Sequence, residues 1–190
     1  MELTRNYEKR HFFVSIAVII AVSIPFAVPF FPFIISDVMY ATRETWFIQT
    51  PKAAYFLWGA GFLLWLLATI IIYYFNVNKA SLIVGIVMFI LSFIPIVLGA
   101  NHYKELSDDG VTFSEISTLD QKHYKWDEIN KIVYHLEKEK GKRSILEFQF
   151  KDGNNVKLVR DSHLSNDYYK LREKISEYQI EFVNSKNSSD

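Results

Sequence analysis

The sequence predicts three transmembrane helices followed by a small α+β domain, in which an antiparallel sheet is covered by one C-terminal helix. Of 42 charged residues in the 190-residue chain, only ten lie in residues 1–100 and the other 32 lie in residues 101–190. The first half also contains three long stretches without any charge. After Tyr103, apolar residues mostly recur at every second position, which is typical of strands, and an amphipathic helix follows. The two halves are therefore adapted to different environments, lipid and water.

Each charge-free stretch exceeds the roughly 20 apolar residues that cross a bilayer, and a soluble protein of this size has no core that could bury three of them. The link from Asn76 to Lys79 is short, so the second and third spans form an antiparallel hairpin. A cleaved signal peptide is an alternative for the first stretch, but the stretch is long and no clear cleavage site follows it. The transmembrane domain is expected at residues 12–100, after an N-terminal tail at 1–11, with spans at about 12–35, 53–75 and 80–100.

The first span contains three prolines, Pro25, Pro29 and Pro32, spaced i, i+4 and i+7 on one helical face. Each proline removes a backbone hydrogen bond and bends the helix, so we expect the second half of this span to be kinked or partly unwound. The functional interpretation is a hinge, or a re-entrant element that lines a cavity. The structural interpretation, which we favour, is a kinked helix that packs against its neighbours.

Small residues on the other two spans are candidates for close helix packing. Gly59 and Gly61 lie in the second span, and Ser81 and Gly85 have small-xxx-small spacing in the third. Between its ends, no span contains Asp, Glu, Lys or Arg, which argues against a transporter or a proton pathway.

Basic residues near span ends set orientation, because cytoplasmic loops carry more Lys and Arg. The two sides of this chain are nearly balanced, with Arg5, Lys9, Arg10 and Lys79 against Arg43, Lys52 and Lys104. The cluster before the first span favours a cytoplasmic N-terminus. Three full crossings then place residues 101–190 outside the cytoplasm, whereas a re-entrant first segment leaves them inside. We therefore expect a multi-pass protein of the cell membrane whose soluble domain leans to the extracytoplasmic side, with its side left open.

Residues 101–182 have the pattern of one small soluble domain. Its strands are separated by turn signals, of which Asp152-Gly153 is the strongest and is typical of a type I′ hairpin turn. An apolar stripe over residues 164–178 predicts an amphipathic helix. Residues 183–190, which are polar from Asn184 onward, are expected to form a disordered tail. We expect strands at about residues 111–113, 123–126, 132–136, 146–150 and 156–158.

Two motifs in this half resemble those of the bacterial pleckstrin-homology-like domains: Tyr124-Lys125-Trp126-Asp127-Glu128-Ile129, and Phe150-Lys151-Asp152-Gly153 ahead of the terminal helix. The resemblance covers about residues 103–182. It implies a strongly bent sheet capped by the helix, a scaffold or recognition role, and no catalytic residues. Such domains often follow transmembrane hairpins in small bacterial envelope proteins. Phosphoinositide binding is not implied, because no dense basic cluster is present.

We consider three features as contact sites: a basic turn, a single tryptophan and a short apolar segment. The turn at residues 137–143 could touch lipid headgroups or a partner, at about 1 kcal/mol per basic residue, although a solvated hairpin tip is the simpler interpretation. Trp126 is expected to anchor the core rather than to stack on a ligand. The segment Trp46-Phe47-Ile48 is expected at the membrane interface, as an anchor, a lid or a partner contact. The basic residues of the turn are Lys138, Lys140, Lys142 and Arg143.

Composition also disfavours several functional classes. The chain has no cysteine, which excludes disulfides, thiolate metal sites and thiol nucleophiles. Its formal net charge of zero disfavours nucleic-acid binding. Its five histidines lack metal-binding spacing, and no serine lies in a nucleophile motif. We therefore expect no metal, no cofactor and no enzymatic activity.

We predict a non-catalytic, membrane-tethered interaction or sensing module, with envelope stress or toxin immunity as candidate settings. Its expected partners are the lipid bilayer and either a membrane protein or a second copy of the chain, without nucleic acid. One alternative is an accessory subunit of a membrane transport or secretion complex. A second alternative is an interfacial lipid-modifying enzyme, for which the candidate residues are His102, Glu105 and Asp108.

Overall fold

A computed structural model of the chain describes residues 2–116, 119–136 and 143–186. The chain folds as two compact units. The first consists of Met1–Tyr40, Thr50–Tyr103 and Glu115–Leu119, and the second of Ala41–Gln49, Lys104–Ser114 and Asp120–Asp190. The second unit therefore begins between the first two long helices rather than after the third.

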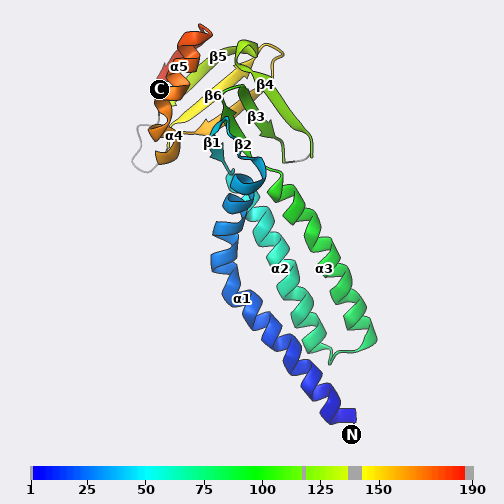
Figure 1. The fold of residues 1–190 in the computed structure, drawn as a ribbon. Coiled ribbons are helices and arrows are strands. Elements are labelled where there is room, and N and C mark those ends of the chain that lie inside the picture. The colour runs from blue at the N-terminus through cyan, green and yellow to red at the C-terminus, as the bar shows by residue number, and fades with distance from the viewer. Residues whose placement is uncertain (1, 117–118, 137–142, 187–190) are drawn as a thin grey trace. The chain divides into compact units, whose positions relative to one another are not determined.

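The first unit contains three long helices, α1 (Glu2–Tyr40), α2 (Lys52–Tyr74) and α3 (Lys79–Ala100). Lys9–Tyr40 of α1, and the whole of α2 and α3, are long and apolar enough to cross a membrane. α2 and α3 lie side by side, and α1 packs mainly on α2 (Figure 1). The three stretches predicted from composition are thus helices, and α1 also takes in residues 2–11, which were predicted to form a tail.

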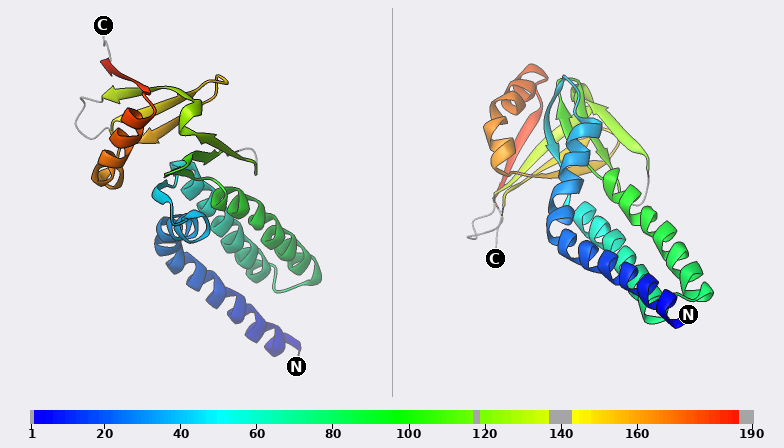
Figure 2. Two further views of the ribbon diagram at one scale, coloured as in Figure 1. Left: turned by 45° about the horizontal axis from the view of Figure 1, so that its top comes forward. Right: turned by 60° about the horizontal axis from the view of Figure 1, so that its bottom comes forward.

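The prolines of the first span do not interrupt α1. Pro25, Pro29 and Pro32 all lie inside one helix, so the second half of the first span is not unwound. Figures 1 and 2 show α1 changing direction along its length, which is the effect expected of residues that lack an N–H donor. The three rings do not share one environment, because Pro32 is buried whereas Pro25 and Pro29 are exposed.

Small residues set the distance between α2 and α3. A Cβ added to Gly61 would lie 2.5 Å from Ile96 Cγ1, and one added to Gly85 would lie 2.8 Å from Ile72 Cγ1. Each glycine therefore leaves its space to a side chain of the facing helix. Gly59 differs, because a Cβ there would meet only Val28, at 4.0 Å.

Gly61→Ala should weaken the contact between α2 and α3, whereas Gly59→Ala should not. The methyl group at position 61 must displace Ile96, at a cost of about 1–3 kcal/mol. The methyl group at position 59 meets ordinary contact distances, and alanine's higher helix propensity adds about 1 kcal/mol of stability. Unfolding of both variants in detergent micelles measures the difference. Equal effects would contradict the close packing at Gly61.

The second unit is built from two four-stranded sheets. The first sheet is antiparallel, with the strand order β1 (Thr45–Gln49), β2 (Lys104–Ser107), β3 (Gly110–Ser114) and β4 (Gln121–Lys125). The second has the strand order β7 (Asn155–Val159), β6 (Ile145–Phe150), β5 (Ile129–Leu136) and β8 (Glu181–Lys186). A single 3₁₀ turn, Trp126–Glu128, connects β4 to β5.

β1 is the largest departure from the expected fold. Its residues lie between α1 and α2 in the sequence, yet β1 pairs with β2, placing Phe47 opposite Leu106 and Gln49 opposite Lys104. Trp46 and Phe47 are only 8% and 1% exposed. The prediction of an interfacial segment is therefore wrong, because Trp46 and Phe47 of Trp46-Phe47-Ile48 belong to the core of the second unit.

The C-terminal end also differs from expectation. The predicted single helix is divided into α4 (Ser162–Asn166) and α5 (Tyr168–Glu177), because Asp167 leaves regular helix geometry between them (φ −97°, ψ 12°). Residues 183–186, predicted to be disordered, belong to β8, which pairs in parallel with β5. The second sheet is therefore mixed rather than purely antiparallel. Residues 187–190 of the predicted tail lie outside the described residues.

The hairpin between β6 and β7 is wider than a two-residue turn. The Gly153 N–H donates to Phe150 O (3.0 Å), and the Phe150 N–H donates to Asn154 O (2.9 Å). Within the Asp152-Gly153 pair only Gly153 has a left-handed φ, of 87°, so the turn is not the predicted type I′. The Asp152 carboxylate accepts a hydrogen bond from the Tyr124 hydroxyl of β4 (2.7 Å), which ties this hairpin to the first sheet.

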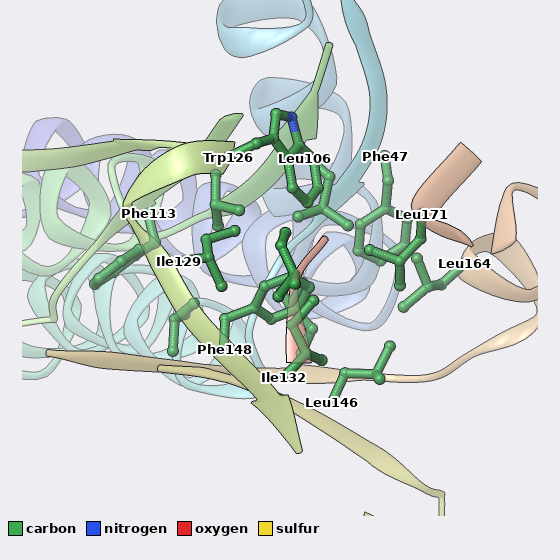
Figure 3. Close-up of a cluster of buried hydrophobic side chains, with 14 of the residues drawn as sticks. Phe47, Leu106, Phe113, Trp126, Ile129, Ile132, Leu146, Phe148, Leu164 and Leu171 are labelled. Atoms are coloured by element: carbon green, nitrogen blue, oxygen red, sulfur yellow. The ribbon is translucent and has the colours of Figure 1, made fainter. Parts of the chain in front are cut away.

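One hydrophobic core joins both sheets with α4 and α5. Figure 3 shows Phe47 of β1, Leu106 of β2 and Leu171 of α5 within this cluster. Trp126 is fully buried, and its indole N–H donates to Ser107 O (3.1 Å). The expectation that Trp126 anchors the core is thus confirmed.

Candidate functional site

A polar pocket of about 490 Å³ lies at one edge of the second sheet. Its lining comes from β5, from the residues just before β6, from those just after β7 and from α4: Tyr134, Arg143, Ser144, Arg160, Asp161, Ser162 and Ser165. All seven belong to the second unit. Among the residues that the structure describes, no group of His, Asp and Glu could hold a metal ion. We take the pocket, with its two arginines, as the candidate site.

The strand register explains why these residues meet. Tyr134 of β5 lies opposite Leu146 of β6, and Ile145 of β6 lies opposite Val159 of β7. The residues flanking these pairs therefore reach the same edge of the sheet. The backbone ladder continues one step past the strands, because the Arg160 N–H donates to Ser144 O (2.8 Å).

Arg160 is the most firmly positioned side chain of the pocket. Its Nη1 donates a hydrogen bond to Tyr134 Oη (2.9 Å). Its guanidinium carbon lies 4.4 Å from the centroid of the Tyr168 ring and 5.6 Å from that of Tyr134, which adds cation–π attraction. Within the described ranges, no carboxylate pairs with Arg160 or with the exposed Arg143.

The surroundings of the Tyr134 hydroxyl change its pKa. Burial raises the pKa of Tyr134, but hydrogen bonds with Ser144 and Arg160 and the charge of Arg160 outweigh it, so the pKa lies below its usual value. The shift favours the phenolate and has the sign expected at a site that attracts negative charge.

Asp161 is the acidic residue of the lining, and two of its oxygens accept hydrogen bonds from α4. Its Oδ1 accepts a hydrogen bond from the Leu164 N–H (2.9 Å), which caps α4. Its backbone carbonyl accepts a hydrogen bond from the Ser165 hydroxyl (2.7 Å). With two arginines and one aspartate, the lining keeps a net positive charge.

The pocket includes one of the four basic residues predicted to contact headgroups or a partner. Arg143 lines it, while Lys138, Lys140 and Lys142 lie outside the described residues. Sequence reasoning did not single out the remaining lining residues. A usable signal was the sequence Arg160-Asp161-Ser162, in which a strand ends and a helix-capping aspartate begins the next element.

The other predicted site residues lie elsewhere. Gly59, Gly61, Ser81 and Gly85 belong to the helices of the first unit, as do Pro25, Pro29 and Pro32. Of the three residues considered for an enzyme, Glu105 is 7% exposed and accepts a hydrogen bond from the Thr45 hydroxyl. Asp108 lies in the turn after β2, and His102 follows α3. None of the three lines the pocket.

No protein-family model matches this chain, and no curated protein sequence matches it. The fold and the pocket are therefore the basis on which a function is proposed.

Proposed function

We propose that this chain is a non-catalytic recognition or sensing module, in which three membrane spans tether a pleckstrin-homology-like domain. The length and apolar composition of α1, α2 and α3 support the spans, with the bilayer as the partner of their exposed apolar side chains. Two sheets that share one core with the C-terminal helices support the domain assignment, as does the burial of Trp126 and Ile129 from the motif. β1 and β8 extend the domain beyond residues 103–182.

The observation that carries this proposal is the position of β1 in the chain. β1 and β2 pair in one sheet, although α2 and α3 lie between them in the sequence. Only four residues separate α1 from β1, and only two separate β1 from α2. The first sheet is thus joined to the ends of all three helices rather than to one flexible linker. This connectivity suits a sensor, because only a few residues connect each helix to a strand of the first sheet.

The side of the membrane is part of the proposal. Because α1 is one continuous helix, we favour three full crossings over a re-entrant first segment. With the N-terminus in the cytoplasm, as its basic cluster favours, the second unit then lies outside the cytoplasm.

The cysteine-free chain allows a direct test. Single cysteines would replace the exposed Lys79, at the start of α3, and the exposed Lys151, in the β6–β7 hairpin, before labelling with a membrane-impermeant maleimide. We expect Lys151→Cys to react in intact cells and Lys79→Cys to react only after permeabilisation. Arg43→Cys, between α1 and β1, is a second position that should behave like Lys151→Cys. Labelling of positions 79 and 151 from the same side would overturn the tether.

A further inference from the structure

The pocket at the edge of the second sheet offers hydrogen-bond donors in excess of acceptors. Arg143 and Arg160 contribute guanidinium N–H groups, and Ser162 contributes an exposed hydroxyl. Asp161 is the single acidic residue of the lining, and its Oδ1 and backbone carbonyl are already used by Leu164 and Ser165 of α4. Because two arginines outweigh one aspartate, a ligand that suits this lining must bring negative charge and hydrogen-bond acceptors.

Arg160 is held in place before any ligand arrives. It is fixed by its hydrogen bond to Tyr134 (2.9 Å) and by the Tyr168 ring 4.4 Å away. A fixed guanidinium loses little side-chain entropy on binding, and its planar fork matches two oxygens of a tetrahedral anion. Among the described residues, the side-chain hydrogen bond of its guanidinium runs from Nη1 to Tyr134, so other guanidinium N–H groups can donate to a ligand.

We propose that this pocket binds a phosphate ester, with Arg143 and Arg160 contacting the phosphate oxygens and Ser162 supplying a further donor. The net positive charge of the lining matches an anionic ester. The volume of about 490 Å³ falls within the range of roughly 300–1,000 Å³ typical of small-molecule sites, so the pocket has room for an organic group beside the phosphate. The inference rests on the proposed function in that it names the ligand of the recognition domain. A soluble phosphate ester and a lipid headgroup share this chemistry.

The test uses the full chain in maltoside micelles, which contain no phosphate. Isothermal titration calorimetry with glycerol 3-phosphate at constant ionic strength measures the affinity, and glycerol serves as the uncharged comparison. Arg143→Gln removes a pocket cation at an exposed position, where folding should tolerate the change. Arg172→Gln is the matched control: Arg172 is also exposed and lies 5.4 Å from the Tyr168 ring, but it does not line the pocket.

We expect Arg143→Gln to weaken binding by about tenfold or more, as for loss of a charged hydrogen bond, and Arg172→Gln to change it less than about twofold. The proposal is overturned if the folded wild type does not bind glycerol 3-phosphate at millimolar concentration. It is also overturned if glycerol binds equally well, or if both substitutions weaken binding equally.

A second arm identifies the source of the phosphate. If phosphatidylglycerol nanodiscs abolish the binding of glycerol 3-phosphate seen in micelles, the pocket is occupied by a lipid headgroup. If binding persists unchanged, the ligand is a soluble phosphate ester. If the cysteines label as expected but no phosphate ester binds, the ligand proposal is wrong and the proposal of a membrane-tethered module stands. If a phosphate ester binds but positions 79 and 151 are labelled from the same side, the tether proposal is wrong and the ligand proposal stands.

Discussion

Removal of Thr50–Tyr103, with Gln49 joined to Lys104 through an Asn-Gly turn, should give a water-soluble domain that folds alone. Gln49 and Lys104 lie directly opposite each other in the β1–β2 pair, so a two-residue turn closes an ordinary antiparallel hairpin. Both sheets and the shared core keep every strand. Residues 41–49 joined in this way to 104–186 should be monomeric by size-exclusion chromatography and unfold cooperatively in circular dichroism.

The matched control is the fragment 104–186 without β1, which should not unfold cooperatively. It lacks Trp46 and Phe47, which are 8% and 1% exposed in the intact chain. Truncating one buried aromatic side chain costs about 3–5 kcal/mol, a large share of the roughly 5–15 kcal/mol that stabilises a domain. The loss also leaves the edge of β2 unpaired and open to aggregation. A cooperative transition in this shorter fragment would contradict the structural role of β1.

Gly110→Ala should cost about 3 kcal/mol of stability, because the added methyl group meets backbone rather than side chain. Gly110 lies opposite Lys125 in the β3–β4 pair. A Cβ there would collide with the Tyr124 carbonyl oxygen and lie 3.0 Å from Lys125 Cα. Backbone atoms within a ladder cannot rotate away, so the strands must separate locally. Urea unfolding followed by tryptophan fluorescence measures the loss.

Gly153→Ala is the control, because it measures the cost of a left-handed backbone without a steric collision. Gly153 has a φ of 87°, and a Cβ there would find no atom within 4 Å. Its substitution should therefore cost only the roughly 1–2 kcal/mol of a left-handed backbone. A loss at Gly110 no larger than that at Gly153 would contradict the close approach of β3 to β4 at Gly110.

Local patterns in the sequence predicted the elements whose signals lie among neighbouring residues. The charge-free stretches correspond to α1, α2 and α3. They were predictable because the length and composition of a span can be read from one continuous segment. The alternation at residues 111–113 and 146–150 falls within β3 and β6. The burial of Trp126 was predictable in the same way, from its place at the start of a strand connection.

Pairings between distant segments were not predictable. Trp46-Phe47-Ile48 is too short to reveal its partner, and the apolar helices on both sides suggested a membrane interface. The sequence of β8, in which only Phe182 and Val183 are apolar, likewise hides its parallel pairing with β5. Arg143 is the one lining residue that the sequence analysis predicted as a contact site. The other lining residues come from the ends of several elements, and strand register brings them together.

The position of β1 also determines the order in which the chain can mature. β1 leaves the ribosome before α2 and α3, and β2 follows only after both helices have been synthesised. The first sheet therefore cannot close until the helical hairpin is made. A chain arrested before that step keeps Trp46 and Phe47 exposed, as aromatic residues that chaperones and proteases recognise in incomplete folds. In the full chain, completion of the sheet thus requires that both helices have been synthesised.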